Sequence, residues 1–196
     1  MTRLRTAILI SGRGTNMSAI LEAASAADYP ISPVIVLSNR PEAAGLEHAS
    51  EAGTNTIVVD HKAFGKDREA FERAMQATLL DHNVEMIILA GFMRILTPWF
   101  VNLWSGRMIN IHPSLLPKYP GLNTHQRAID AADKEAGCSV HWVTEGVDEG
   151  DVIAQARVPV LPDDTADSLA ARVLPAEHML YPKAAAIAAR DILARG

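Results

Sequence analysis

Asn110 and His112 are the two side chains that the sequence places best for chemistry. They stand at the end of the short apolar run 107–111, directly before a loop that contains three prolines and Gly121. Active sites of α/β enzymes lie where a strand ends in such a loop. Residues two apart in a strand point to the same side, so an amide lies beside an imidazole. Such a pair can stabilise an oxyanion and handle a proton.

Asp148 is the candidate carboxylate that could serve this histidine. It lies in a loop after the apolar run 139–143, and a glycine stands two residues away on either side, at positions 146 and 150. The backbone can bend there to aim the carboxylate inward, where it would favour the protonated form of His112 and fix the ring. Taken alone, Asp148 is typical of a turn residue, so its assignment depends on the other sites.

A glycine-rich turn, residues 11–16, follows the first apolar run and precedes a helical pattern. Backbone N–H groups at a helix N-terminus form an anion site. The G-x-G-x-x-G pattern of dinucleotide sites needs glycine at position 17, where this chain has Met17, and the Gly-Lys-Ser/Thr of a P-loop is absent. The turn therefore predicts a site for a single phosphate. The alternative is a simple strand-to-helix turn with Thr15 or Asn16 as the cap.

The loop 90–96 is apolar apart from Arg94. Such a surface suits a flat aromatic or heterocyclic ligand whose polar edge is read by the backbone. The alternative is a buried crossover loop in which Arg94 pairs with a carboxylate.

Composition limits the classes of function. The 196 residues carry a formal charge of −5, with a pI near 5.8, which argues against a general attraction to nucleic acid or to an anionic membrane. The single cysteine, Cys138, excludes an internal disulfide and a multi-cysteine metal site, and no pair of histidines has metal-ligand spacing. No apolar run approaches the roughly 20 residues of a membrane span. We expect a cytoplasmic protein without a metal.

Short β-rich runs alternate with longer helical patterns, which predicts an α/β fold with a Rossmann-like, mostly parallel twisted sheet of about seven strands and helices on both faces. After about residue 136 no crossover helix separates the strands, so this part of the sheet is expected to be antiparallel or mixed. Pro175 predicts a break or kink after Val173, and Pro182 suits the first turn of a final helix. We expect one domain over 1–196, with a phosphate-binding half at about 1–104 and a catalytic half at about 105–196. The expected strands are 6–10, 34–38, 56–59, 86–90, 107–111, 139–143 and 152–160, and the expected helices are 16–26, 43–52, 66–82, 98–104, 125–132, 167–173 and 182–194.

Four segments together resemble the phosphoribosylglycinamide formyltransferase family. They are 10–16, 90–96, 110–121 and 139–148, and the resemblance runs in order from about residue 4 to residue 183. The Asn-x-His-Pro-Ser-Leu-Leu-Pro segment with a downstream aspartate marks the wider formyltransferase and hydrolase superfamily. The N-terminal phosphate turn and the chain length fit this family within it.

The resemblance implies transfer of a formyl group from 10-formyltetrahydrofolate, a co-substrate, to the amine of N1-(5-phospho-D-ribosyl)glycinamide, called glycinamide ribonucleotide below. The products are the N2-formyl compound and tetrahydrofolate, in de novo purine biosynthesis. It further implies a cis peptide bond at Leu116-Pro117. The implied catalytic residues are Asn110, His112 and Asp148; the phosphate and ribose residues are Gly14, Thr15, Asn16 and Glu177; the folate residues are Phe92, Met93, Arg94, Ile95, Leu96, Val143, Thr144, Val147 and Asp148.

Three other functions remain open from the sequence. A formyltetrahydrofolate hydrolase, or another folate-dependent formyltransferase, would use the same catalytic residues. An NADP-dependent enzyme would place Gly12 and Gly14 on the pyrophosphate and Arg40 on the 2′-phosphate, but the missing third glycine argues against it. A non-catalytic nucleotide- or folate-binding module would leave Asn110, His112 and Asp148 structural. The expected partners are small molecules, with neither nucleic acid nor membrane, and the expected assembly is a monomer or a homodimer.

Overall fold

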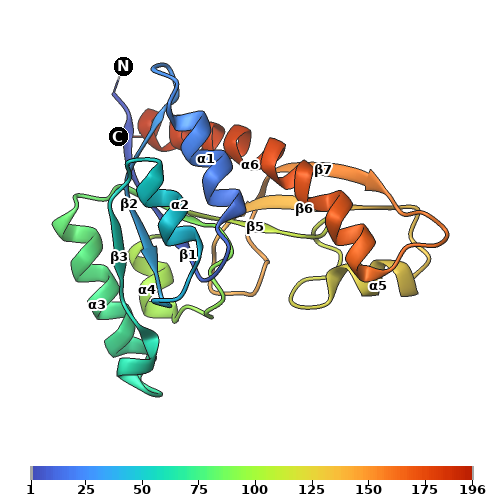
Figure 1. Ribbon diagram of the computed structural model, residues 1–196, viewed down its shortest axis with the longest axis horizontal. Helices are drawn as coiled ribbons and strands as arrows, with labels where there is room; N and C mark the ends of the chain where they lie inside the picture. The colour runs from blue at the N-terminus through green and yellow to red at the C-terminus, as the bar shows by residue number, and fades with distance from the viewer. Residues whose placement is uncertain (1, 196) are drawn as a thin grey trace.

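The computed structural model describes residues 2–195, and a single seven-stranded sheet runs through it (Figure 1). The strands lie in the order β3-β2-β1-β4-β5-β6-β7. The first five in this order are parallel to one another, whereas β6 is antiparallel to β5 and β7 to β6. The predicted mixed sheet is therefore confirmed. The strands are β1 (Leu4–Ile10), β2 (Ile31–Ser38), β3 (Thr56–Val58), β4 (Met86–Leu89), β5 (Met108–His112), β6 (Glu135–Trp142) and β7 (Val152–Pro159).

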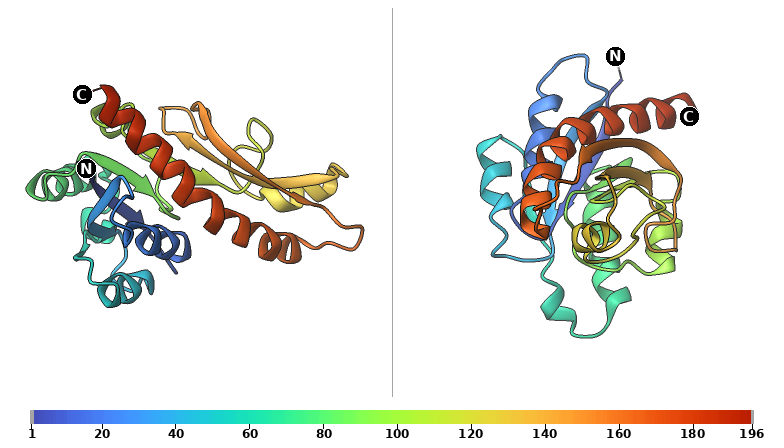
Figure 2. Two further views of the ribbon diagram at one scale, coloured as in Figure 1. Left: turned by 90° about the horizontal axis from the view of Figure 1, so that it is seen from above. Right: turned by 90° about the vertical axis from the view of Figure 1, so that its right-hand side faces the viewer.

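Helices cover both faces of this sheet, as predicted. One buried cluster packs α1 (Thr15–Ala24), α2 (Gly45–Glu51), α5 (Thr124–Asp130) and α6 (Ala166–Arg195) against one face. A second cluster packs α3 (Arg68–Asp81) and α4 (Pro98–Leu103) against the other face. A short 3-10 helix, η1 (His61–Phe64), precedes α3. Figure 2 shows α6 lying across the sheet from the side of α5 to the side of α1.

The hydrophobic runs of β1 and β4 explain why these two strands lie in the middle. Side chains 6–10 and 86–89 are buried, because helices cover both faces of the parallel part of the sheet. The β1 strand lies between β2 and β4, and the strand order reverses direction there. In open α/β sheets, ligands bind at the carboxyl ends of the strands beside such a reversal.

The predicted helix start at Pro182 is wrong, and Pro175 does not break the helix. The kink given as the alternative at Pro175 stays a prediction. Both prolines lie inside α6, which is 30 residues long. A proline inside a helix removes one hydrogen bond and bends the axis, but packing on both sides can hold the helix together. Buried positions recur every four residues across both prolines, at 169, 173, 177, 181, 185 and 189. This continuous buried stripe outweighs the local cost of the two prolines.

Within the described residues, no helix combines the length and the apolar character that a membrane crossing needs.

Tyr181 connects α6 to the centre of the sheet. It is fully buried, and its hydroxyl donates to the carbonyl of Leu89 in β4 at 2.8 Å. We expect Tyr181→Phe to lower the free energy of unfolding by about 1–2 kcal/mol, because a buried carbonyl loses its donor. Urea denaturation measures this change.

Tyr29→Phe is the matched control. The Tyr29 hydroxyl donates to the carbonyl of Pro182 in the same helix at 2.7 Å, but this bond is only partly buried. Its loss should cost less, under about 1 kcal/mol. Equal losses in the two variants would contradict the role given to Tyr181.

Candidate active site

Asn110, His112 and Asp148 lie together in the wall of a cavity of about 760 Å³. Asn110 and His112 come from the last residues of β5, and Asp148 comes from the loop between β6 and β7. The loop after β4, the segment 121–126 and the first turn of α6 complete the wall. Residues from five parts of the sequence thus meet at one end of the sheet.

His112 is buried, and protein oxygens face both of its ring nitrogens. Its Nδ1 lies 3.2 Å from Asp148 Oδ2, and its Nε2 lies 2.9 Å from the carbonyl oxygen of Tyr119. A carbonyl only accepts hydrogen bonds, so Nε2 carries a proton. When Nδ1 is protonated as well, it donates to Asp148. Oxygen partners at both nitrogens thus fix the orientation of the ring.

Asp148 is held by a strained backbone and by several donors. Its φ is +56°, a left-handed conformation that aspartate and asparagine adopt more readily than most residues. The N–H of Gly121 donates to Oδ2 at 2.9 Å. Burial would raise the pKa of this carboxyl, but the hydrogen bond with His141, the N–H of Gly121 and the charges of His112 and His141 together bring its pKa below the ordinary value. Asp148 is therefore a stable anion beside His112.

His141 is a member of this cluster that the sequence did not reveal. It is buried, and it lies directly across from Asn110 in the pairing of β5 with β6. Its Nε2 lies 3.3 Å from Asn110 Nδ2 and 3.5 Å from Asp148 Oδ1. The only available signal was the register between the two strands, which residue spacing alone does not supply.

The tautomer of His141 fixes the amide of Asn110. His141 Nδ1 lies 2.9 Å from the carbonyl oxygen of Trp142, so Nδ1 carries the proton in the neutral ring. In the neutral ring Nε2 accepts a hydrogen bond from Asn110 Nδ2, whereas in the charged ring Nε2 donates to Asp148 Oδ1. Because Nδ2 has two hydrogens, one remains to point into the cavity. This geometry turns the amide so that a donor faces the space where a substrate oxygen would lie.

His125 also lines the cavity without having been predicted to do so. Its Nδ1 is buried and has no hydrogen-bond partner among the described residues. Burial, followed by the charge of His112, lowers the pKa of His125. An unpaired nitrogen in a cavity wall is typical of a group that meets a ligand or a bound water.

A smaller cavity of about 170 Å³ adjoins the larger one and shares Phe92, Arg94, Asn110 and Asp148 with it. All nine residues expected to contact folate line one cavity or the other, and Met93 lines only the larger. Met93 and Ile95 are 72% and 67% exposed, which is unusual for large apolar side chains. Arg94 lies over the ring of Phe71 at 5.7 Å, not beside a carboxylate, so the alternative reading of this loop is wrong.

The glycine-rich turn has an open helix N-terminus. Gly14 has a φ of +71° and precedes the first residue of α1, and no described side chain caps that helix. A Cβ at position 14 would lie 2.9 Å from the Cα of Gly45, so only glycine fits. The alternative interpretation, a cap by Thr15 or Asn16, is therefore wrong, and the N–H groups of the first turn stay available to an anion.

Glu177 and Asn16, predicted from separate segments, are in contact. Asn16 Nδ2 donates to Glu177 Oε2 at 2.7 Å, and Asn16 Oδ1 is buried without a partner among the described residues. Burial raises the pKa of Glu177, and the Asn16 bond partly counters this shift. Neither residue lines the two cavities. The turn follows β1, and Asn110 lies on β5. Only β4 separates these two strands, so two strand spacings, or roughly 10 Å, lie between them.

The proline loop after β5 is attached to the sheet through Ser139. The Ser139 hydroxyl donates to the carbonyl of Ser114 at 2.6 Å and accepts from the N–H of Leu116 at 3.0 Å and from Gln155 Nε2 at 2.8 Å. The Leu116-Pro117 bond is cis, as predicted. Each of these contacts fixes the loop that brings the carbonyl of Tyr119 to His112.

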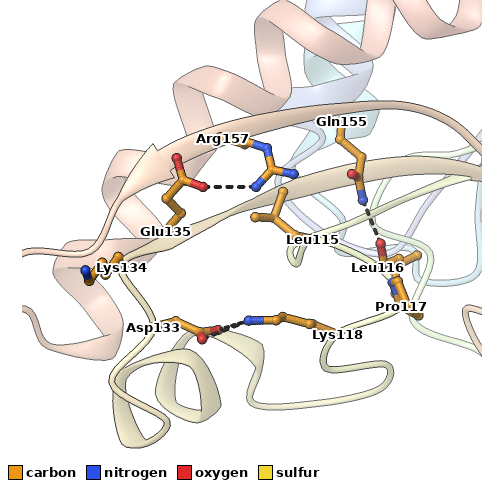
Figure 3. A pocket seen from close by; sticks show the side chains of 9 residues that line it. All are labelled: Leu115, Leu116, Pro117, Lys118, Asp133, Lys134, Glu135, Gln155 and Arg157. Atoms are coloured by element: carbon orange, nitrogen blue, oxygen red, sulfur yellow. Dashed lines mark hydrogen bonds and ion pairs between the residues drawn. The ribbon is translucent and has the colours of Figure 1, made fainter.

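A third hollow, of about 360 Å³, lies behind this loop (Figure 3). Four of its charged side chains form two ion pairs, Lys118 with Asp133 at 2.8 Å and Arg157 with Glu135 at 3.0 Å. None of the predicted site residues lines it. Across residues 2–195, no group of three or more His, Cys, Asp or Glu side chains is arranged to hold a metal ion.

Comparison with known proteins identifies the family. Residues 4–185 match the formyl transferase family. The chain belongs to the formyl transferase family. This confirms the resemblance drawn from the four sequence segments.

Individual members of the formyl transferase family support the same assignment. Phosphoribosylglycinamide formyltransferase of Escherichia coli is 46% identical over 175 residues, which cover 89% of this chain and 82% of that protein. The crystal structure of phosphoribosylglycinamide formyltransferase from Brucella melitensis has a TM-score of 0.91 and 52% identity, covering 96% of both chains. Glycinamide ribonucleotide transformylase 1 from Symbiobacterium toebii has a TM-score of 0.92 and 42% identity, covering 96% of this chain and 89% of that one.

Larger formyl transferase family members also match. The trifunctional purine biosynthetic protein adenosine-3 of Drosophila melanogaster is 48% identical over 187 residues, which cover 94% of this chain. The match covers 14% of the length of that protein.

The buried charge of Asp148 predicts a pH-dependent contribution to stability. Its folded pKa is lowered, so its contribution is complete above the unfolded pKa of about 4 and disappears as the pH falls through the folded pKa. We expect Asp148→Asn to lower the free energy of unfolding by about 1–2 kcal/mol at pH 7, and the difference from wild type to shrink as the pH falls below about 4. Asparagine accepts the left-handed backbone, so the variant isolates the charge.

Asp81→Asn, at the exposed end of α3, is the control and should change stability little at either pH. Urea denaturation at pH 7 and pH 3 measures both variants. A difference between wild type and Asp148→Asn that stays constant with pH would contradict the assigned charge.

Proposed function

We propose that this protein transfers the formyl group of 10-formyltetrahydrofolate to the amine of glycinamide ribonucleotide, in purine biosynthesis. The observation that carries the proposal is the cluster of Asn110, His112 and Asp148 in the wall of the larger cavity, where Asn110 and Asp148 also line the adjoining smaller cavity. The names of the relatives that cover nearly the whole chain support the same reaction. The co-substrate is a folate, and the chemistry needs no metal.

Asn110 and His112 supply the electrostatic part of the reaction. The neutral amine attacks the formyl carbon, and the carbonyl oxygen becomes an oxyanion. The free hydrogen on Asn110 Nδ2 donates to this oxygen, and the positive charge of protonated His112 stabilises it. Asp148 keeps that charge on His112 through the 3.2 Å contact. Tetrahydrofolate leaves when the bond from the formyl carbon to N10 breaks.

His112 acts through its charge in the geometry seen here. Both of its N–H groups point to protein oxygens, those of Tyr119 and Asp148. A direct hydrogen bond from Nε2 to the oxyanion requires the contact with the carbonyl of Tyr119 to break first. The attacking nitrogen must lose a proton and N10 must gain one, and the pair His112 and Asp148 stays charged throughout.

The two substrates meet at the shared wall. The ribonucleotide phosphate binds at the N–H groups of Gly14, Thr15 and Asn16, and Glu177 accepts from the ribose hydroxyls. The glycinamide arm then reaches the roughly 10 Å to Asn110. The folate ring enters the smaller cavity between the loop after β4 and the segment 143–148. A formyltetrahydrofolate hydrolase would have no use for the contact between Asn16 and Glu177.

The proposed setting follows from the same residues. All candidate residues belong to one chain, so a monomer is sufficient, although a homodimer remains compatible with it. Cys138 is buried and free, and burial raises its pKa to about 12, which suits the reducing cytoplasm that we propose as its compartment. Among possible partners we propose only the two small-molecule substrates.

One assay tests the proposed function. Purified protein is incubated with 10-formyltetrahydrofolate, with and without glycinamide ribonucleotide, and both formylated ribonucleotide and free formate are measured. The proposal expects the formylated product only when the ribonucleotide is present. Formate release that does not depend on the ribonucleotide would identify a hydrolase and overturn the proposal.

His112→Ala should abolish most of the turnover. We expect kcat to fall by about three orders of magnitude, because the charge beside the oxyanion is lost. The Kd values of both substrates should change by less than about tenfold, since His112 acts on the transition state. Steady-state kinetics and calorimetric binding separate the two effects.

His82→Ala is the control for this variant. His82 is partly buried at the end of α3, and its Nδ1 contacts only its own helix, at the carbonyl of Thr78. The control should keep wild-type kcat. If His112→Ala also kept wild-type kcat, the catalytic role of His112 would be wrong.

Glu177→Gln should weaken the binding of the ribonucleotide and leave the binding of folate unchanged. The variant keeps the shape of the side chain but loses the negative charge that accepts from the ribose hydroxyls, so the Kd of the ribonucleotide should rise about tenfold. Because the pKa of Glu177 is raised, wild-type affinity should also weaken as the pH is lowered, while the affinity of the variant should not follow this change. Calorimetry at several pH values measures both effects.

Glu51→Gln, at the exposed end of α2, is the matched control and should leave both Kd values unchanged. An equal loss of folate affinity in Glu177→Gln would argue that Glu177 is only structural.

A further inference from the structure

Ser11 is a buried polar residue at the end of β1, between the two proposed substrate sites. It is 4% exposed and is the first residue of the glycine-rich turn. Its backbone N–H donates to the carbonyl of Gly91 at 3.1 Å, and its hydroxyl oxygen accepts from the N–H of Met93 at 2.8 Å. Backbone and side chain of one residue thus hold two points of the loop after β4.

The direction of the Ser11 hydroxyl is fixed by Asn39. The hydroxyl lies 2.5 Å from Asn39 Oδ1, and an amide oxygen has no hydrogen to give. The Ser11 hydrogen therefore points to Asn39, and a lone pair remains for Met93. Asn39 is 1% exposed and follows β2, and its Nδ2 lies 3.2 Å from His61 Nδ1. The ends of β2, β1 and β4 are joined through this one hydroxyl.

Beyond Met93, the next hydrogen bonds that hold this loop within the described residues are at its far end. There Glu72, which is 1% exposed, accepts from the N–H of Thr97 at 2.7 Å and from the Thr97 hydroxyl. Between these two attachments lie the side chains of Met93 and Ile95, which are largely exposed in the cavity wall. The position of this wall thus depends on where Ser11 lies.

The rest of the glycine-rich turn, residues 12–16, follows Ser11 directly. The carbonyl of Gly12 accepts from the N–H of Gly45 at 3.0 Å, and Gly14 packs against Gly45. A phosphate that orders residues 12–16 would restrain Ser11 through the chain itself. The same restraint would pass through the Ser11 hydroxyl to Met93.

We propose that Ser11 is a positioning residue that couples the two substrate sites, so that ribonucleotide bound at the glycine-rich turn strengthens folate binding at the loop after β4. The proposal rests on the proposed function, because it takes these two ligands as the occupants of the two sites. Ser11 touches neither reacting group and acts through Met93 and Gly91. Coupling of this kind is reciprocal: folate strengthens ribonucleotide binding by the same factor.

The test is a binding cycle on the full chain. Calorimetry gives the Kd of tetrahydrofolate, which has no formyl group to transfer, with and without saturating glycinamide ribonucleotide. In wild type we expect the ribonucleotide to lower this Kd by about fivefold or more, the lower end of typical coupling. In Ser11→Ala the two Kd values should agree within about twofold, because Met93 has lost its acceptor.

Ser38→Ala is the matched control. Ser38 is also a buried serine at the end of a neighbouring strand, and its hydroxyl also donates one bond and accepts one. Both bonds go to Arg40, within its own loop, so the variant loses similar contacts without touching either site. It should keep the wild-type coupling factor. Asn39→Ala removes the acceptor that orients the Ser11 hydroxyl, so this variant should also reduce the coupling. It replaces Ser11→Ala in the test if Ser11→Ala does not fold.

The outcomes separate this inference from the proposed function. If wild type turned over normally but the coupling factor were equal in wild type, Ser11→Ala and Asn39→Ala, the role of Ser11 would be overturned. The proposed function would remain intact. Absence of coupling in wild type would overturn the role of Ser11 as well. If Ser38→Ala lost the coupling to the same extent as Ser11→Ala, the effect of Ser11 would be one of general packing and the specific role proposed for it would be wrong. A wild-type protein that forms no formylated product would remove both proposals.

Discussion

A carboxylate half-buried beside His112 must be compensated, and the site is arranged around that need. Asp148 obtains its compensation from the N–H of Gly121 and from two histidines on adjacent strands. These contacts bring the proline loop, the ends of β5 and β6 and the segment 143–150 to one point. The left-handed backbone at Asp148 and the glycine at 150, where any Cβ would collide with the carbonyl of Trp142, are costs of that convergence.

The mixed sheet explains why the cluster lies on β5. This strand is parallel to β4 on one side and antiparallel to β6 on the other. The parallel neighbours bring the turns after β1 and β4 to its carboxyl end, as in any open α/β sheet. The antiparallel neighbour brings His141 directly opposite Asn110. Both candidate substrate sites accordingly combine residues from the first half of the chain with residues from the second.

Local sequence patterns were sufficient for most of the fold and for the three central residues. Alternation along β5 placed Asn110 and His112 on one side, and the missing crossover after residue 136 predicted the antiparallel strands. His141 and Ser11 could not be found in this way, because their roles depend on contacts between strands far apart in sequence. The two prolines of α6 led to a wrong helix boundary because only their local cost to helix hydrogen bonding entered the prediction. The buried stripe that runs past them, which holds the helix together, becomes visible only in the folded chain.

Net charge adds a constraint on how the proposed substrates are bound. Both are anionic, and the chain carries a formal charge of −5, so its long-range field does not attract them. Under the proposed function, binding comes from short-range groups: helix N–H groups at Gly14 to Asn16, Arg94 in the loop after β4, and His112. Such groups act only when their geometry is fixed. This requirement explains why so many buried hydrogen bonds, those of Ser11, Ser139 and Asp148 among them, hold loops and not elements of the core.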